Sequence, residues 1–428
     1  MMRWMTIIIL LNTTLATYAE DGFDDDGFDA DVMTIAIDHA PEAKGVLYGS
    51  NELEAHYNFN NDKDLSLLKL STDILGEYKL DNGFKIKANL KAYYDFIYGL
   101  SNNYTITPKD YEYDSNLNEI SIEGEVAPNI DIKVGRQIVV WGKSDSIRIT
   151  DILNPLDNRV PGLVDIKNLR LGRFMSKLDY YANNLNASVI AIHENRFTKN
   201  AAYGSDFKLS TDKDTNKPDD NIKNTSLALS LTGSFESFDA GLYFADTYID
   251  KPYLDNNVLH YDNKSKMLGM AYNKVIDNFL IKAEVAHFDR IKYSGVSDTK
   301  SRTDTLLGVE YNGIRDGSIS YELALRNIHN YDNAINTAAN GNKGKEEYQQ
   351  AIRFNQSYLN QTLDLLATIN MFGKQAEDGG STRVSLEYAL DDKTSISGGI
   401  IDYIGGDNPT IDAYKDNDRI FTKINYSF

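Results

Sequence analysis

The chain has 428 residues, of which 42% are hydrophobic and 25% charged, and its formal net charge is −19. The absence of cysteine excludes a disulfide framework, a thiolate metal site and a cysteine nucleophile. The negative charge excludes general binding to nucleic-acid phosphates, which requires clustered lysine and arginine. Beyond residue 19, no run approaches the roughly 18 apolar residues of a membrane-spanning helix. What remains is a large acidic soluble protein, or a β-barrel whose membrane signal is spread over many strands.

Residues 1–19 have the features of a secretory signal peptide. Arg3 supplies the positive start, residues 7–11 form a short apolar core, and residues 17–19 offer small side chains at the −3 and −1 positions for cleavage before Glu20. A buried N-terminal strand is the alternative interpretation. We expect this segment to be removed on export.

Residues 20–45 form an acidic stretch in which Asp-Gly-Phe-Asp occurs at 21–24 and again at 26–29. Acidic, low-complexity composition is typical of a disordered tail, which here would lie in the periplasm. A docking or cation-binding role for this tail is the alternative. We expect residues 46–428 to form the folded part of the chain.

From about residue 46 onward, apolar and polar residues alternate with a period of two, which indicates β-strands. One face of the segment 84–96 carries Phe84, Ile86, Ala88, Leu90, Ala92, Tyr94 and Phe96, and the other carries Lys85, Lys87 and Lys91. The ten steps from Phe84 to Tyr94 span roughly 33 Å, which projects to about 25 Å at a tilt of about 40°. That is the height of the apolar band of an outer-membrane barrel, whereas strands of soluble sheets are usually shorter.

The spacing of strands and connections predicts an all-β fold, a transmembrane antiparallel β-barrel of about 18 strands, with 16 as the alternative. The strands are expected to start near residues 46, 66, 84, 114, 130, 173, 185, 224, 237, 264, 278, 302, 317, 347, 361, 381, 393 and 417. Long polar stretches lie at 99–113, 142–172, 195–223, 249–263, 289–301, 329–346 and 405–416, with two shorter ones at 59–65 and 374–380. Short turns centre between them on residues 82–83, 128–129, 183–184, 234, 275–276, 313, 359–360 and 391–392. Short periplasmic turns that alternate with long outer loops, and an even strand number, are typical of bacterial outer-membrane barrels.

The last strand supports the same interpretation. Ile420, Thr422, Ile424, Tyr426 and Phe428 share one face. A closed barrel must pair its last strand with its first, because no strand edge can face lipid. A terminal aromatic strand of this kind resembles the signal read by the outer-membrane barrel-assembly machinery, which is therefore an expected partner.

The segment 130–142 departs from the simple alternation. By strict alternation Arg136 faces lipid together with Val134, and an arginine in mid-membrane costs roughly 2–4 kcal/mol. We therefore predict that Gly135 forms a bulge that turns Arg136 into the lumen. The alternative is that Arg136 lies near the outer interface and extends its charge into water.

The long loop 142–172 is unusually apolar for a loop in water, which predicts that it folds inward against the barrel wall and narrows the pore. Its apolar residues include Ile147, Ile149, Ile152, Leu153, Leu156, Val160, Leu163, Val164 and Ile166. Basic residues outnumber acidic ones between positions 142 and 173, so either these charges contact a solute or they pair with one another and pin the loop. The predicted pore or constriction residues are Arg136, Gln137, Trp141, Lys143, Asp145, Arg148, Asp151, Asn154, Asp157, Arg159, Arg170 and Arg173.

Three segments resemble a known family. Val-Gly-Arg-Gln-Ile-Val-Val-Trp-Gly at 134–142, Asn-Pro-Leu-Asp-Asn-Arg at 154–159 and Lys-Leu-Asp-Tyr-Tyr at 177–181 are similar to a proteobacterial porin-like outer-membrane family of unknown function. That family is sometimes grouped with polysaccharide-export barrels. The resemblance is specific over about 130–181, and it implies an outer-membrane barrel and transport without naming a solute or a catalytic residue.

The favoured function is a channel for small polar solutes in the cell outer membrane, because a barrel of 16 to 18 strands encloses water. Lumen-facing positions carry both charge signs, and opposed clusters of them would orient solutes in a transverse field. These positions include Asp73, Glu77, Lys85, Lys87, Lys91, Glu119, Glu123 and Glu125. Lipid, lipopolysaccharide and a small polar solute are the expected partners, and association of several copies is left open.

Two other functions are weighed against a channel. A binding or adhesin barrel with a plugged lumen would use its outer loops, for which the acidic positions Asp212, Asp214, Asp219 and Asp220 could hold divalent cations. An outer-membrane hydrolase is disfavoured, because none of the six histidines lies in a recognisable catalytic or zinc motif. We expect no enzymatic activity, no metal site and no cofactor.

Overall fold

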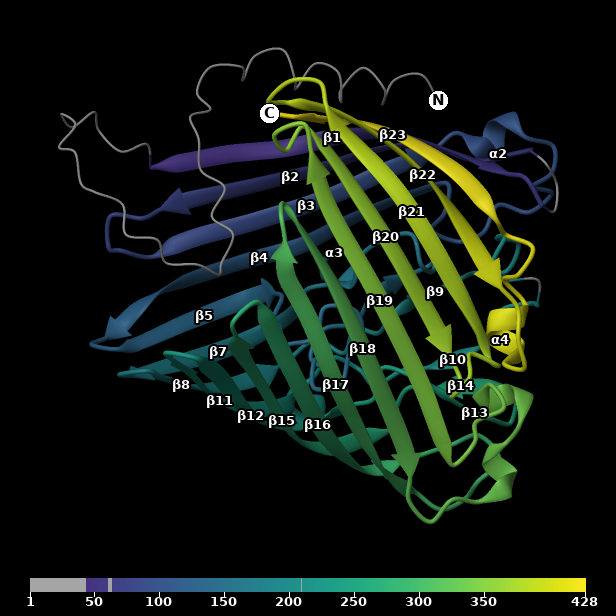
Figure 1. Ribbon diagram of the computed structural model, residues 1–428. Coiled ribbons are helices and arrows are strands. Elements are labelled where there is room, and N and C mark those ends of the chain that lie inside the picture. The colour runs from purple at the N-terminus through teal and green to yellow at the C-terminus, as the bar shows by residue number, and fades with distance from the viewer. Residues whose placement is uncertain (1–43, 61–63, 209) are drawn as a thin grey trace.

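The computed structural model describes residues 44–60, 64–208 and 210–428, and these form a closed barrel of 18 antiparallel strands (Figure 1). The barrel strands are β1 (Gly45–Asn58), β2 (Asp64–Lys79), β3 (Lys85–Asp95), β4 (Tyr113–Ala127), β5 (Ile130–Gln137), β7 (Arg173–Ala182), β8 (Leu185–Ile192), β11 (Ser226–Phe235), β12 (Phe238–Tyr248), β15 (Lys264–Ile276), β16 (Phe279–Ile291), β17 (Lys300–Ile314), β18 (Gly317–Ile328), β19 (Glu346–Tyr358), β20 (Leu363–Phe372), β21 (Gly379–Ala389), β22 (Thr394–Ile404) and β23 (Arg419–Ser427). The predicted signal peptide and almost all of the predicted acidic tail lie outside the described residues.

The barrel closes between its first and last strands. β1 and β23 pair antiparallel from Ser50 opposite Ser427 to Asn58 opposite Arg419. Every barrel strand therefore has a hydrogen-bonded neighbour on both sides, as lipid requires of a spanning sheet. The expectation of a closed 18-stranded antiparallel barrel is confirmed.

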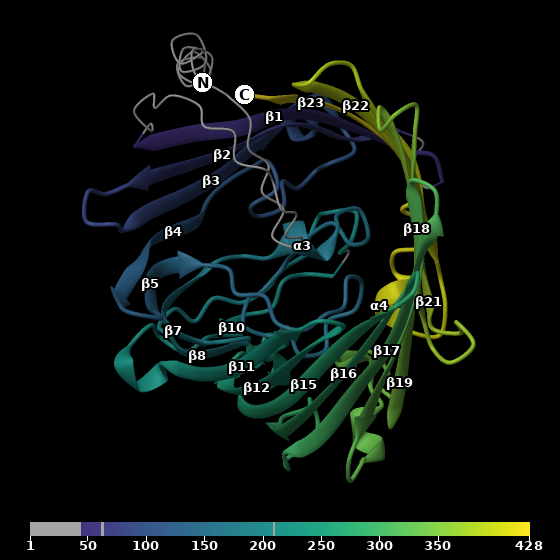
Figure 2. The same cartoon turned by 60° about the vertical axis from the view of Figure 1, so that its left-hand side comes forward.

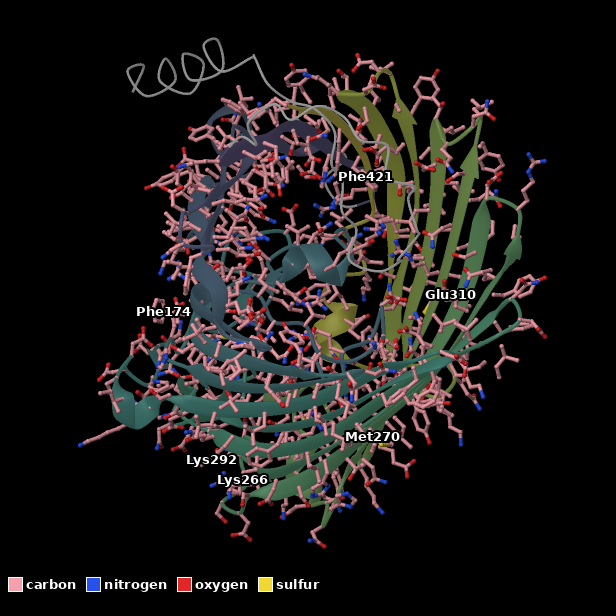
Figure 3. The ribbon with its side chains drawn as sticks, turned by 90° about the vertical axis from the view of Figure 1, so that its left-hand side faces the viewer. Phe174, Lys266, Met270, Lys292, Glu310 and Phe421 are labelled. Carbon is pink, nitrogen blue, oxygen red and sulfur yellow. The ribbon has the colours of Figure 1, made fainter. Side chains whose placement is uncertain are left out.

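Alternation along the strands separates an outer apolar face from an inner face. In β3, Ile86, Leu90 and Tyr94 remain 38–41% exposed on the outside of the barrel. In β11, the outward Leu227 is 53% exposed, whereas the inward Ala228 next to it is fully buried. Figure 3 shows the same arrangement, with Met270 projecting from the outer surface of the ring and Phe421 on its inner side.

The predicted strand starts agree with the structure to within two residues throughout. Three of the predicted turn centres are wrong, because residues 234, 275–276 and 313 still belong to β11, β15 and β17. The turns follow two or three residues later, where Asp277 and Asp316 adopt positive φ angles of 51° and 55°. Aspartate tolerates this left-handed conformation, which a tight hairpin turn requires.

Short elements occupy the long connections. They are α2 (Ile97–Leu100), β6 (Asp157–Asn158), α3 (Ile166–Leu169), β9 (Lys199–Asn200), β10 (Thr215–Asn216), η1 (Ile222–Asn224), β13 (Tyr253–Asp255), β14 (Val258–His260), η2 (Asn333–Ile335), η3 (Ala338–Asn340) and α4 (Pro409–Asp412). Within the described part of the chain, no helix is long and apolar enough to cross a membrane. Figure 2 shows α3 and the loop that carries it inside the ring of strands.

The lumen charges of β2 to β5 form pairs between neighbouring strands. Lys85 of β3 lies 3.0 Å from Glu123 of β4 and 3.7 Å from Glu77 of β2, and Lys133 of β5 lies 2.9 Å from Glu123. Lys91 lies 3.4 Å from Asp73 in the same way. These charges neutralise one another on one wall, so the expectation of opposed clusters from these residues is wrong.

Candidate functional site: the inward-folded loop

The connection between β5 and β7, residues 138–172, lies against the inner wall of the barrel, starting four residues earlier than predicted. Ile147, Ile149 and Leu153 are at most 2% exposed. They belong to one apolar cluster with inward residues of β15 to β18, among them Met267 and Leu306. Burial of these side chains supplies the driving force that a polar surface loop would lack.

Trp141 anchors the start of this loop. Its ring stacks on Tyr243 of β12 with a centroid distance of 4.9 Å and an angle of 27°. The Tyr243 hydroxyl also accepts a weak hydrogen bond of 3.5 Å from the Gly142 N–H. Gly142 has a φ of +86°, and a Cβ there would lie 2.7 Å from the Glu284 carboxylate, so no larger residue fits without a shift.

Glu284 of β16 binds the loop through its carboxylate, which is buried. It accepts hydrogen bonds from the backbone N–H groups of Lys143 (2.6 Å), Ser144 (2.9 Å) and Thr150 (3.1 Å), and from the Thr150 hydroxyl (2.7 Å). A buried carboxylate is stable only when its oxygens are hydrogen-bonded, and this one is.

Glu322 of β18 also binds this segment of the loop through its carboxylate. It accepts from the Ser144 hydroxyl at 2.7 Å and from the N–H groups of Asp145 (3.0 Å), Ser146 (3.1 Å) and Ile147 (3.2 Å). Sequence reasoning missed Glu322 and Glu284. The available signal was a glutamate at an inward position of a strand, but the strand gives no indication of which loop it will meet.

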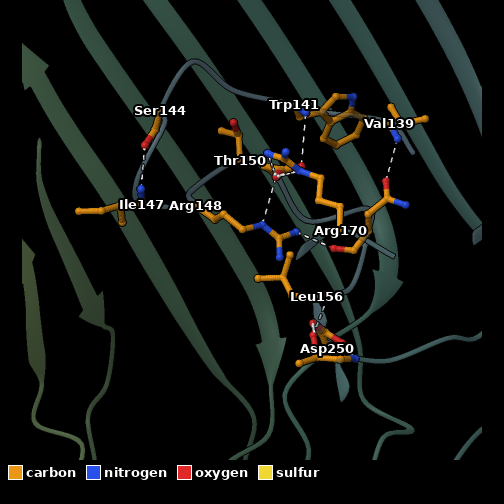
Figure 4. A network of polar contacts seen from close by, with 12 residues as sticks. Val139, Trp141, Ser144, Ile147, Arg148, Thr150, Leu156, Arg170 and Asp250 are labelled. Carbon is orange, nitrogen blue, oxygen red and sulfur yellow. Dashed lines mark hydrogen bonds and ion pairs between the residues drawn. The ribbon is translucent and has the colours of Figure 1, made fainter. Parts of the chain in front are cut away.

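Asp151 joins two arginines of the loop. Its carboxylate accepts from Arg148 Nε at 3.1 Å and from Arg170 Nε at 2.9 Å (Figure 4). Asn154 closes the base of the loop by accepting from the Val139 N–H at 2.8 Å and donating to the Leu171 carbonyl at 2.9 Å. Asp151 and Asn154 are both buried, so these contacts hold the loop in shape.

Arg159 attaches the middle of the loop to β4. Its guanidinium lies 2.9 Å from Asp114 and donates through Nε to Asp157 at 2.8 Å. It also donates to the Tyr93 hydroxyl at 2.8 Å. The charges of Arg159 and Asp157 are therefore paired with each other and with the wall.

Asp165, at the far end of the loop, binds two arginines of the opposite wall. It lies 2.6 Å from Arg383 of β21 and 2.9 Å from Arg353 of β19. Burial alone would raise the pKa of Asp165, but the positive charges of Arg353 and Arg383 hold this pKa below its usual value. Neither arginine was predicted as a site residue.

The remaining predicted residues divide into buried and accessible groups. Gln137 and Arg173 are at most 3% exposed, and Arg173 donates to the Leu153 carbonyl at 3.1 Å. Lys143 pairs with Asp239 of β12 at 3.1 Å, and Asp145 pairs with Lys282 of β16. The side chain of Asp145 is 56% exposed, which makes it the most accessible charge of the predicted set that faces the lumen.

Arg136 lies apart from the other predicted residues. The pairing of β5 with β4 and β7 runs through Gly135 without a register shift, and Arg136 lies opposite Ile120 and Phe174, which are 45% and 43% exposed on the outer face. The predicted bulge at Gly135, and with it the lumen position of Arg136, is wrong. Arg136 instead pairs on the outer face with Glu194 at 2.7 Å. The outward position agrees with the alternative, which placed Arg136 near the outer interface, but the charge is paired with Glu194 and not simply extended into water.

The profile of a family described as "Protein of unknown function (DUF1302)" matches residues 28–428. No curated protein matches the sequence.

Several solved outer-membrane structures have a similar fold. The outer membrane protein OpdK of Pseudomonas aeruginosa has a TM-score of 0.53 and 10% identity over 90% of this chain and 99% of that chain. Pseudomonas aeruginosa OccK2 (OpdF), solved with glucuronate, has a TM-score of 0.51 and 12% identity over 90% and 97%. Acinetobacter baumannii OccAB4 has a TM-score of 0.52 and 11% identity over 89% and 97%. The fold is that of outer-membrane porins, in agreement with the expected location in the outer membrane.

Proposed function

We propose that this chain, which belongs to the DUF1302 family of proteins of unknown function, forms an outer-membrane channel for small polar solutes whose passage is narrowed by the loop 138–172. The observation that carries this proposal is the double attachment of the loop by Glu284 and Glu322, because six backbone N–H groups of residues 143–150 donate to two buried carboxylates of the wall. A loop held in this way is a permanent part of the lumen. An 18-stranded barrel without it would enclose a wide aqueous channel.

The solved structures suggest which solutes to test first. OccK2 was crystallised with glucuronate and OpdK with vanillate, and both ligands are small carboxylic acids. Small polar acids are therefore the first class to test for this chain. A lumen that is narrowed by a fixed loop favours such solutes over polysaccharide chains, so export of polysaccharide is the weaker hypothesis.

A plugged binding or adhesin barrel is the second candidate, and one observation favours it. The loop contacts several sides of the interior, since Arg159 reaches β4, Glu322 lies on β18, and Pro161 accepts a 2.6 Å hydrogen bond from Tyr403 of β22. A loop that spans the interior could close it.

Conductance separates the two functions. Purified full-length protein in a planar bilayer should show stable single-channel currents, and replacing Glu284 and Glu322 together with Gln should enlarge them by releasing the loop. Glu387→Gln is the matched control, because Glu387 is an exposed glutamate of β21 and forms no ion pair within the described part of the chain. No current from the wild type, with current appearing only in the double variant, would establish the plug instead.

A further inference from the structure

A row of inward residues crosses β17, β18 and β19 on the short-turn side of Glu322. Glu310 of β17 is the register partner of Ser320 of β18, and Ser320 is the register partner of Arg353 of β19. The row faces the lumen, because Ala351, two residues from Arg353, belongs to the interior apolar cluster. Glu322, two residues from Ser320, holds the loop. A carboxylate, a hydroxyl and a guanidinium therefore lie next to one another on the wall beside the loop.

Each side chain of this row keeps hydrogen-bonding groups that no described residue uses. Glu310 is bound only through Oε2, which lies 3.2 Å from the Lys282 ammonium. Arg353 donates only through Nη1, to Asp165 at 2.9 Å. The Ser320 hydroxyl has no hydrogen-bond partner within the described part of the chain. The side chains of Glu310 and Arg353 are 21% and 25% exposed, so a solute in the lumen can reach both.

The β17 end of the row carries an excess of negative charge. Lys282, whose side chain is only 5% exposed, pairs with both Asp145 and Glu310. One cation therefore faces two carboxylates, and the more accessible groups are the carboxylates. Glu284 and Glu322 lie nearby and accept N–H groups of the loop, so they add to the negative charge.

The β19 end of the row carries an excess of positive charge, because Asp165 pairs with both Arg353 and Arg383. The next inward carboxylates on this wall are Glu387 of β21, four residues from Arg383, and its register partner Asp364 of β20. Four residues of a strand span about 13 Å, which exceeds the Debye length of about 8 Å at physiological ionic strength. These two carboxylates therefore do not neutralise the arginines.

The spacing of the row fits two opposite charges of one small molecule. Directly opposed residues of antiparallel strands have Cα atoms about 4.5–5.5 Å apart, so Glu310 and Arg353 lie about 10 Å apart across Ser320. When both side chains extend from the wall in parallel, two charge-assisted hydrogen bonds of about 2.8 Å leave a gap of about 4 Å. The N–Cα, Cα–C and C–O bonds of an α-amino acid together measure about 4.2 Å, so its ammonium and its carboxylate can span this gap.

We infer that Glu310, Ser320 and Arg353 form a binding site for one small zwitterion, a molecule with an ammonium and a carboxylate on the same carbon atom. The ammonium binds the Glu310 carboxylate, and the carboxylate binds the free donors of Arg353. A simple anion is repelled at the β17 end and a simple cation at the β19 end, so a molecule with both charges binds best. This inference rests on the proposed function, because the zwitterion is taken to be a solute of the channel, and it narrows the small acids to those that also carry an ammonium.

The test uses purified full-length protein in detergent and three probes, namely glycine, acetate and methylammonium, with binding measured by saturation-transfer NMR. Glycine carries both charges, whereas each of the other two probes carries one. Wild type should bind glycine about tenfold more tightly than either of them, the effect of one additional charge-assisted hydrogen bond.

Substitutions at the two ends of the row should have crossed effects. Arg353→Gln should weaken binding of glycine about tenfold and weaken acetate, but leave methylammonium unchanged. Glu310→Gln should weaken glycine to a similar extent and weaken methylammonium, but not acetate. A general loosening of the loop would change all three probes together. Ser320→Ala should weaken glycine about threefold, and it breaks no contact between described residues.

Matched controls are Arg315→Gln and Glu387→Gln, which should leave glycine binding unchanged. The side chain of Arg315 is 97% exposed in the turn between β17 and β18, and Glu387 is exposed on β21. Glycine bound no more tightly than acetate or methylammonium, or bound equally by wild type and both end variants, would overturn the inference. The same protein is then placed in a planar bilayer. Conductance without a preference for glycine overturns only this site, whereas that preference without conductance overturns only the channel.

Discussion

The Ser144 hydroxyl donates a 2.7 Å hydrogen bond to Glu322, a residue 178 positions later in the chain and buried on the barrel wall. The same carboxylate accepts the N–H groups of the three following residues of the loop. This relationship makes the loop part of the wall, and it determines the effects of several substitutions.

Replacement of Glu322 by Gln should loosen the loop. The amide would present an N–H₂ group to backbone donors that need an acceptor, and loss of charge-assisted hydrogen bonds at a buried site costs about 2–3 kcal/mol. We expect faster hydrogen exchange of residues 143–150 and a larger single-channel current. Glu387→Gln, at an accessible position of β21, should change neither quantity.

Replacement of Trp141 by Ala should destabilise the interior more than any charge change in the loop. The stack on Tyr243 would be lost and a cavity left in the apolar cluster, at a cost of about 3–5 kcal/mol. Thermal unfolding monitored by circular dichroism should show a lowered midpoint. Trp141→Phe keeps a ring over Tyr243 and should recover most of the loss, and equal midpoints for the two variants would contradict the role of stacking.

Arg136→Ala should leave ion selectivity unchanged, because Arg136 pairs with Glu194 on the outer face of the wall and does not line the lumen. The substitution should instead lower the free energy of unfolding of the barrel, because the ion pair with Glu194 is lost. For a partly exposed pair we expect a coupling free energy of about 1 kcal/mol in a double-mutant cycle with Glu194→Ala. Reversal potentials in a salt gradient provide the check, and a shift toward cations in Arg136→Ala would place this side chain in the passage after all.

Acid should release the far end of the loop. Arg353 and Arg383 hold the pKa of Asp165 below its unfolded value of about 3.9, so their stabilisation is fully present above about pH 4. It is lost as the pH falls through the lower folded-state pKa, because Asp165 then becomes protonated. Single-channel current should therefore become larger or noisier below about pH 4.

Asp165→Asn removes the charge at every pH, so this variant should show the looser behaviour already at neutral pH and lose the acid transition. Asp298→Asn, at an exposed loop position, is the control. If Asp165→Asn and wild type kept the same acid transition, the ion pairs of Asp165 would not be its origin.

Strand number, strand starts and the outer face of the barrel were predictable from the sequence. Alternation such as that of Ile86, Leu90 and Tyr94 is a local property, and lipid requires an apolar residue at each outward position whatever the rest of the chain does. The inward fold of the loop was predictable for a similar reason. Ile147, Ile149 and Leu153 are too apolar for a loop in water, and the structure buries them.

The partners of the loop were decided only by the tertiary structure. The closure of 18 strands into a ring brings three wall residues close to the loop, namely Glu284, Glu322 and Arg383. Their positions in the sequence do not indicate this proximity. The same holds for Arg136, since alternation correctly placed it outward but only the folded neighbours supplied Glu194 as a counter-charge. Local periodicity determines which face a side chain takes, whereas closure of the barrel decides which side chains meet.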